Sequence, residues 1–135
     1  MNSFQIERIK EIVAGYPQIK LVYFFGSQAK KEADLLSDYD FAIYLNESDN
    51  LKMRDIQFEL AAKIAKVLQT DKLDIIVMNL VNNPVLKYNI IKDGRIIFEK
   101  SPYRVLAEPK ILNEYFDFQT ELVKNNLTRA VRWQI

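Results

Sequence analysis

Residues 21–27 read LVYFFGS and residues 38–45 read DYDFAIYL, and these two segments decide the fold. Each contains an apolar run of strand length, and the second run is interrupted by two acids. Alternate side chains of a strand point to opposite faces, so Asp38 and Asp40 share one face while Tyr39 points to the other. Burying two carboxylates together without a counter-ion costs several kcal/mol. A divalent cation such as Mg²⁺, which prefers carboxylate and phosphate oxygens, is the natural counter-ion.

Gly26 and Ser27 follow the first apolar run and offer the other half of such a site. Glycine lets the backbone approach a phosphate closely, and the serine hydroxyl is a hydrogen-bond donor. A helix that begins here would direct backbone N–H groups at an anion. The alternative is a simple strand-to-helix turn with Ser27 as the N-cap, and these residues alone leave both interpretations open.

A third acid, Asp74, lies in another apolar run of strand length, residues 73–77. Asp38 has the alternative role of capping a turn, and Asp74 that of a solvated strand end. Asp40 is harder to explain in this way, because it lies inside a strand between two aromatic residues. Taken together, the three acids are a stronger candidate for a functional site than any one of them alone.

The pattern of Gly26-Ser27, a ten-residue spacer and then Asp38-x-Asp40 resembles the signature of the DNA polymerase beta-type nucleotidyltransferase superfamily. More narrowly, the chain resembles the minimal nucleotidyltransferases (MNT) that act as antitoxins beside HEPN-domain toxins. The resemblance covers roughly residues 4–118. It implies a polymerase beta-like fold and a transfer reaction that uses a nucleoside triphosphate and Mg²⁺.

The resemblance also implies a role for each candidate residue. Asp38 and Asp40 are the implied ligands of two Mg²⁺ ions, and Asp74 is the implied third ligand and general base. The implied nucleotide-binding residues are Gly26, Ser27 and Lys30. This sequence departs from the family where arginines commonly follow the serine, because it has Gln28 and then lysines. Lysine keeps the charge but lacks the bidentate geometry of arginine, so the departure slightly favours a protein that has lost catalysis and acts by binding.

Composition excludes several classes of function. The 135 residues suit one domain, and 19 basic against 18 acidic residues give a net charge of +1. Such a balance provides no global field for a nucleic-acid backbone, so we expect no direct nucleic-acid partner. The chain has no Cys and no His, which excludes disulfides, thiol nucleophiles, Cys/His zinc sites and imidazole catalysis. The remaining chemistry must use carboxylates, hydroxyls, lysines or a metal.

The start of the chain has no basic segment followed by a long apolar one, and no apolar run approaches about 18 residues. We therefore expect a cytoplasmic protein without a membrane partner.

Hydrophobic spacing and turn residues predict an alternation of helices and strands. Helices are predicted over residues 3–16 with Ser3 as the N-cap, 51–68, 84–93 and from 103 onward, and strands over 19–25, 38–45, 73–78 and 95–99. This order predicts the α/β (α+β) class: a small mixed sheet with helices packed mainly on one face. Residues 1–120 are expected to form one minimal nucleotidyltransferase domain, and residues 121–135 a C-terminal tail. In the last helix Pro109 is expected to kink or restart the helix, and Tyr115, Phe116 and Phe118 are expected to pack in the core.

The resemblance suggests transfer of AMP from ATP to a tyrosine hydroxyl of a cognate HEPN ribonuclease toxin, which silences the toxin. One alternative is a stoichiometric antitoxin that blocks its partner by contact. Another is a subunit of a small-molecule nucleotidyltransferase of the aminoglycoside type, although the chain is short for an acceptor-binding helical domain.

Overall fold

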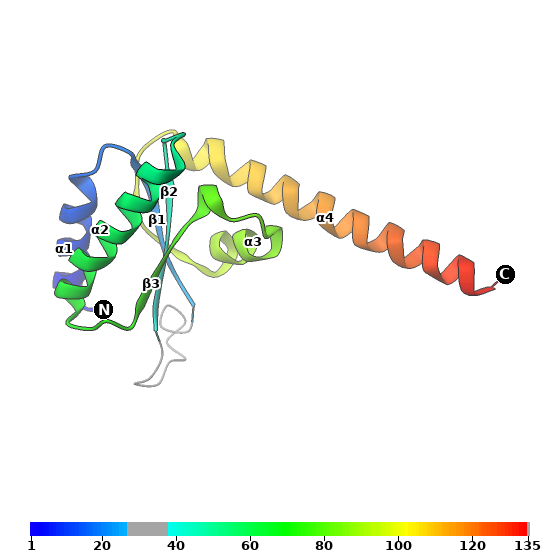
Figure 1. The fold of residues 1–135 in the computed structure, drawn as a ribbon, viewed down its shortest axis with the longest axis horizontal. Helices are drawn as coiled ribbons and strands as arrows, with labels where there is room; N and C mark the ends of the chain where they lie inside the picture. The colour runs from blue at the N-terminus through cyan, green and yellow to red at the C-terminus, as the bar shows by residue number, and fades with distance from the viewer. Residues whose placement is uncertain (27–37, 135) are drawn as a thin grey trace.

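The computed structural model describes residues 1–26 and 38–134, with side chains over residues 1–26 and 38–126. Along the chain the elements are α1 (Ser3–Ala14), β1 (Ile19–Phe25), β2 (Tyr39–Leu45), α2 (Asn50–Leu68), β3 (Leu73–Val77), the 3₁₀ turn η1 (Met78–Leu80), α3 (Pro84–Asp93), β4 (Arg95–Glu99) and α4 (Tyr103–Gln134) (Figure 1). This order confirms the predicted α/β class.

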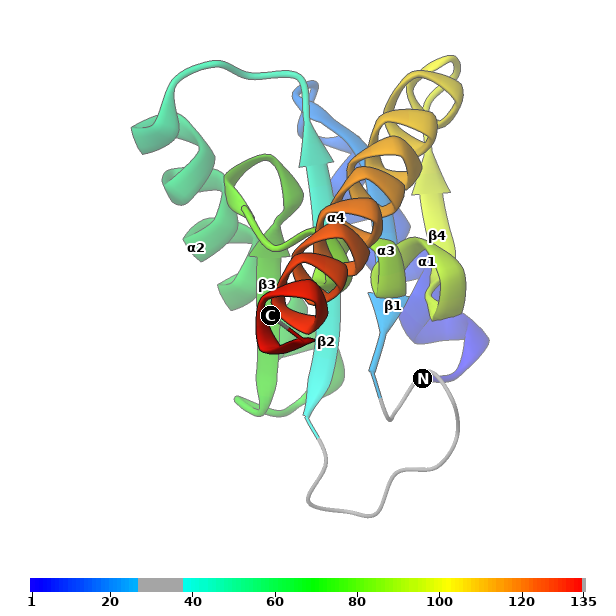
Figure 2. The same ribbon diagram turned by 90° about the vertical axis from the view of Figure 1, so that its right-hand side faces the viewer.

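The four strands form one mixed sheet in the order β3-β2-β1-β4 (Figure 2). β1 runs antiparallel to both β2 and β4, whereas β2 and β3 are parallel. The parallel pair requires a crossover, and α2 provides it. The two strands with interior positions are β1 and β2, whose runs of apolar residues are the longest, while β3 and β4 form the edges.

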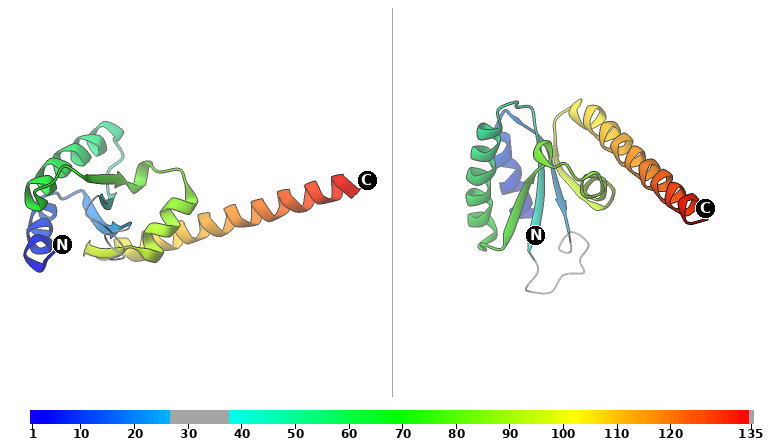
Figure 3. Two further views of the ribbon diagram at one scale, coloured as in Figure 1. Left: turned by 90° about the horizontal axis from the view of Figure 1, so that it is seen from below. Right: turned by 45° about the vertical axis from the view of Figure 1, so that its right-hand side comes forward.

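Helices pack on both faces of the sheet (Figures 1 and 3). α1 and α2 cover one face through the larger core, which includes Ile9, Val13, Val22, Phe41, Ile43, Leu60, Ile64, Ile75 and Val77. α3 and the first turns of α4 pack on part of the other face through a smaller core, which includes Leu21, Tyr23, Ala42, Ile90, Ala107 and Ile111. The alternation of side chains along each strand separates these two cores.

Polar side chains fix the start of three helices. Asn2, rather than the predicted Ser3, caps α1, because its side chain accepts from the N–H of Gln5 while the Gln5 side chain accepts from the N–H of Asn2. Asp49 caps α2 and Asn83 caps α3. These caps satisfy backbone donors that would otherwise lack partners.

α4 is the longest helix and runs away from the body of the protein (Figures 1 and 3). It continues through Pro109 and past residue 120. The missing proline N–H leaves the Val105 carbonyl without its helical partner, but Val105 is 75% exposed, so water can take that role. Within the described residues, no helix combines the length and apolar composition that crossing a membrane requires.

The aromatic residues of α4 do not all pack in the core. Tyr115 stacks on Tyr88 of α3 with ring centroids 3.8 Å apart, and Lys87 forms a 2.7 Å ion pair with Glu114 beside that stack. Phe116, however, is 57% exposed, so its predicted core position is wrong. The Phe116 side chain faces solvent because the neighbouring Tyr115 takes the side of α4 that packs against α3.

Candidate active site

The three predicted acids gather at one end of the sheet. Because β2 and β3 are parallel, both strands begin at the same end, and Asp40 of β2 stands in register with Asp74 of β3. Asp38 immediately precedes β2. Phe41 and Ile75, one residue further along each strand, pack in the core beneath α1 and α2. Asp40 and Asp74 therefore point to the opposite face of the sheet, as alternation along a strand requires.

The acids interact electrostatically. Partial burial raises the pKa of Asp40, and the negative charges of Asp74 and Asp38 raise this pKa further. Asp38 and Asp74 are exposed, whereas Asp40 is half-buried. Asp40 is therefore the carboxylate that gains most from a cation placed between the three groups.

The donor set suits a hard divalent ion, because it consists of carboxylate oxygens with neither sulfur nor imidazole nearby. Within the described part of the chain, no three acidic side chains already stand together as a preformed metal site. Asp38 and Asp74 are solvent-exposed, so their side chains have room to turn toward Asp40. The mutual repulsion of the acids is the observation that fits Mg²⁺, because a bound cation removes this repulsion.

Gly26 joins the end of β1 to the acids. Its φ of +82° lies in the left-handed region, and a Cβ at this position would overlap Oδ2 of Asp40. Phe25, the preceding residue, is the register partner of Asp40. Only glycine therefore lets the chain leave β1 in contact with the Asp40 carboxylate. Ser27, Gln28, Lys30 and Lys31, which complete the predicted phosphate site, lie outside the described residues.

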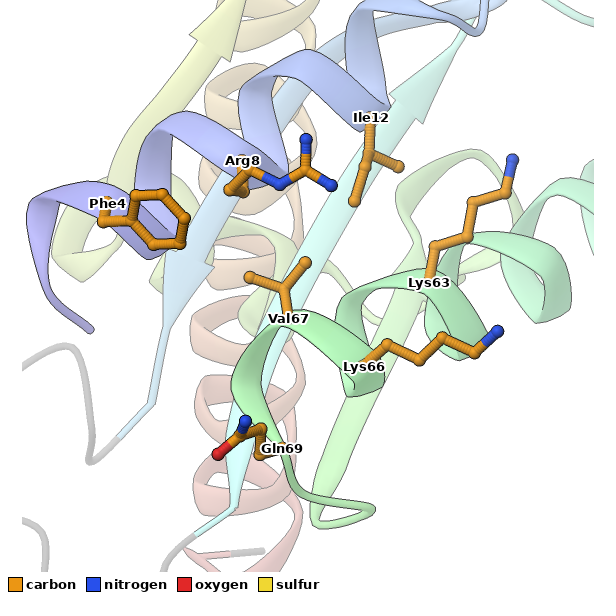
Figure 4. A pocket seen from close by; sticks show the side chains of 7 residues that line it. All are labelled: Phe4, Arg8, Ile12, Lys63, Lys66, Val67 and Gln69. Atoms are coloured by element: carbon orange, nitrogen blue, oxygen red, sulfur yellow. The ribbon is translucent and has the colours of Figure 1, made fainter.

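A second pocket lies away from the acids. It has a volume of about 460 Å³ and lies between α1 and α2, which cover the face opposite Asp40 and Asp74 (Figure 4). Its lining combines apolar and basic side chains: Phe4, Arg8, Ile12, Lys63, Lys66, Val67 and Gln69. It contains none of the predicted site residues, so its size does not make it the active site.

A groove beside Asp74 contains residues that the sequence patterns did not single out. Arg54 and Gln57 of α2 line this groove together with Asp74 and the backbone of β3. Gln57 donates from Nε2 to the carbonyl of Ile75, and Arg54 donates from Nη1 to Oε1 of Gln57. In the sequence, Arg54 and Gln57 are two polar residues spaced three apart on the flank of an amphipathic helix. That spacing does not predict which strand the flank contacts.

Comparison with known proteins identifies the family to which the chain belongs. A family model described as polymerase beta, nucleotidyltransferase matches residues 7–103. The matched range contains Gly26, the three acids and the whole sheet. The chain belongs to the polymerase beta nucleotidyltransferase family.

This nucleotidyltransferase also resembles individual proteins along most of its length. Protein adenylyltransferase MntA of Aphanizomenon flos-aquae is 25% identical over 126 residues, which cover 84% of this chain and 83% of the relative. A chain from a toxin–antitoxin structure with AMP-PNP matches with a TM-score of 0.71 and 22% identity, covering 95% of this chain and 99% of that chain.

A structure of the tri-AMPylated HEPN toxin of Shewanella oneidensis with an MNT antitoxin contains a similar match. Its TM-score is 0.69 at 21% identity, and it covers 95% of this nucleotidyltransferase and 99% of the matched chain. Because these matches extend over nearly the whole chain, they include the projecting helix α4. Together they confirm the predicted fold and the resemblance to MNT antitoxins.

Proposed function

We propose that this nucleotidyltransferase transfers AMP from ATP to a hydroxyl group, that of a tyrosine, on a cognate HEPN ribonuclease toxin and so neutralises it in the cytoplasm. The observation that carries the proposal is the pairing of Asp40 with Asp74 beside Gly26. The named activity of the Aphanizomenon relative and the AMPylated toxin in the Shewanella complex support AMP as the transferred group and a toxin as its acceptor.

The reaction exchanges one phosphorus–oxygen bond for another. The acceptor oxygen forms a bond to the α-phosphorus of ATP, and the bond from that phosphorus to the oxygen bridging to the β-phosphate breaks. Pyrophosphate leaves with the electron pair of the broken bond. The hydroxyl proton passes to the Asp74 carboxylate, which lies beside the open edge of the sheet where an acceptor can approach. Gly26, Ser27 and Lys30 hold the phosphates of ATP.

Asp38, Asp40 and Asp74 would hold two Mg²⁺ ions in this proposal. Bound Mg²⁺ supplies positive charge that polarises the α-phosphate and stabilises the entering and leaving oxygens. The contribution of the chain itself is to hold three carboxylates at one end of the sheet, where Gly26 leaves room for the Asp40 carboxylate.

The direct test is mass spectrometry of the purified HEPN partner after incubation with this chain, ATP and Mg²⁺. We expect the partner to gain the mass of one or more AMP groups on a tyrosine. The double variant Asp38→Ala, Asp40→Ala should abolish this gain while retaining the circular dichroism spectrum of the wild type. The matched control Glu7→Ala, Glu11→Ala removes two exposed acids of α1, which packs on the opposite face of the sheet, and should retain transfer. Full activity of the first double variant would refute the role of the acids.

A second candidate function is a stoichiometric antitoxin that inhibits by contact. The observation that favours it is Gln28 followed by Lys30-Lys31, where the family commonly has arginines. Co-expression with the toxin separates the two functions. Protection that survives the double substitution of Asp38 and Asp40 indicates inhibition by binding, whereas protection that is lost with these acids indicates catalysis.

A further inference from the structure

β3 leaves one of its sides unpaired at the edge of the sheet. Among residues 1–26 and 38–134, β3 pairs only with β2, and it is the terminal strand in the order β3-β2-β1-β4. The Ile75 carbonyl accepts from Gln57 of α2, so this carbonyl points away from β2. The Lys72 carbonyl, by contrast, accepts from the N–H of Tyr39 and points toward β2. By alternation, the N–H groups of Ile75 and Val77 face outward, where an additional strand could pair with them.

A groove of about 290 Å³ follows this outer edge. Its lining includes Arg54 and Gln57 of α2, and Leu80 and Val81 after β3. Asp74, the proposed general base, also lines the groove. A polypeptide that lies along the edge of β3 therefore passes beside the Asp74 carboxylate, which would accept the proton of the acceptor hydroxyl.

The flank of α2 above this groove carries exposed apolar side chains. Phe58 lies one helical turn after Arg54, so the two side chains share a flank of the helix. Phe58 is 71% exposed. Leu51, one turn before Arg54 on the same flank, is 76% exposed. Arg54 forms no ion pair with any other described residue, and its Nη1 donates to Oε1 of Gln57. The flank thus offers an aromatic contact and a cationic group to whatever occupies the groove.

We propose that the hydroxyl-bearing segment of the protein acceptor binds here as an added strand along the outer edge of β3. Its backbone pairs with the outward N–H groups of Ile75 and Val77, an apolar side chain contacts Phe58, and an acidic side chain contacts Arg54. The acceptor hydroxyl then lies beside Asp74. This inference rests on the proposed AMP transfer and adds to it the surface and the conformation by which the acceptor is recognised.

An extended protein segment fits this edge better than a second copy of the chain. Gln57 already donates to the Ile75 carbonyl. If two copies paired through their β3 edges, both copies would therefore lack this carbonyl as an acceptor for the other strand's N–H groups. Such a pairing would also bring two copies of Arg54 near each other, whereas an acidic acceptor segment complements that charge.

Hydrogen exchange of backbone amides tests the strand pairing. When the HEPN partner is added to the full-length protein, the amides of Ile75 and Val77 should exchange at least about tenfold more slowly. The Ile76 amide points toward β2 and serves as the internal control, which should change little. Binding of the partner without added protection at Ile75 and Val77 overturns the proposal. Protection that appears without the partner and grows with protein concentration also overturns it, because this result identifies a second copy as the occupant.

Steady-state kinetics tests the side-chain contacts. Phe58→Ser and Arg54→Ala should each raise the KM for the protein acceptor by about tenfold and leave the KM for ATP unchanged. Phe4→Ser is the matched control for Phe58, because Phe4 is 72% exposed but lies on α1. Lys66→Ala is the control for Arg54, because Lys66 is an exposed cation of α2 in the pocket next to α1. Both controls should retain the wild-type KM for the acceptor.

The outcomes separate this inference from the proposed function. Wild-type protein that transfers no AMP to the partner refutes the function itself. Wild-type protein that transfers AMP, combined with Phe58 and Arg54 variants whose acceptor KM equals that of the two controls, refutes only the docking edge.

Discussion

Asp40 and Asp74 stand side by side in the register of the parallel pair β2–β3. Neither carboxylate forms an ion pair with a described cation, and each like charge nearby raises the pKa of Asp40. The folded protein therefore contains an electrostatic repulsion that lowers its stability. Such a cost is typical of a site that binds a charged ligand.

Replacing Asp40 by Asn should stabilise the metal-free protein. A raised pKa means that the folded state prefers the protonated form, so ionisation of Asp40 costs stability as the pH rises through its pKa. At neutral pH, Asp40→Asn should raise the melting temperature by about 2 to 5 °C. The gain should disappear at acidic pH, where the wild-type carboxyl is protonated. Thermal unfolding at several pH values in EDTA provides the measurement.

Addition of Mg²⁺ provides the control for this prediction. The ion should raise the melting temperature of the wild type and should have little effect on Asp40→Asn, because a ligand stabilises only the form that binds it. Equal stabilisation of both proteins by Mg²⁺ would contradict the assignment of Asp40 as a ligand.

Gly26→Ala should impair the site more than the fold. The new Cβ would overlap the Asp40 carboxylate, and the φ of +82° disfavours alanine. We expect AMP transfer to fall by about tenfold or more, while the circular dichroism spectrum is retained. Gly15→Ala is the matched control, since Gly15 has a negative φ and lies at the end of α1. Equal loss of transfer in both variants would show that the effect is not specific to the Asp40 contact.

Asp74→Asn should separate chemistry from nucleotide binding. Loss of a general base lowers the rate by about 10² to 10⁴-fold. Titration with a fluorescent ATP analogue should show that most of the affinity for nucleotide remains, because the phosphate-binding residues and the other two acids are unchanged. A variant with wild-type single-turnover rates would remove Asp74 from the role of base.

Tyr23→Phe should destabilise the attachment of α4 to the sheet. The buried Tyr23 hydroxyl donates to Oε1 of Glu108 at 2.6 Å, and burial together with this carboxylate raises the pKa of Tyr23, so the hydroxyl stays protonated. We expect the free energy of unfolding in urea to fall by about 1 to 2 kcal/mol.

Tyr16→Phe is the comparison for Tyr23→Phe. The Tyr16 hydroxyl donates to Glu59 at 2.8 Å, but this bond lies at the surface. Its loss should lower the free energy of unfolding much less than the loss of the buried bond. An equal decrease in the free energy of unfolding for both variants would show that burial does not strengthen the hydrogen bond between Tyr23 and Glu108.

The sequence by itself determined the elements and the strand face on which Asp40 lies. Apolar runs of strand length predicted β1 and β2, helical spacing predicted α1 and α2, and Asn83-Pro84 predicted the start of α3. Strand alternation predicted that Asp38 and Asp40 share a face. These features depend on residues that are close in sequence, so local patterns predict them. Where several capping residues were adjacent, as at Asn2 and Ser3, the pattern selected the wrong one.

The tertiary structure alone decided which distant groups meet. Asp74 adjoins Asp40 because α2 returns the chain for parallel pairing, and no local pattern sets that register. Gly26 contacts Asp40 because β1 and β2 pair antiparallel at their ends. The open edge of β3 beside Arg54 follows from strand order, and the exposure of Phe116 follows from which side of α4 packs against α3. Such contacts depend on packing between elements that are remote in sequence, and local patterns in a single sequence do not predict that packing.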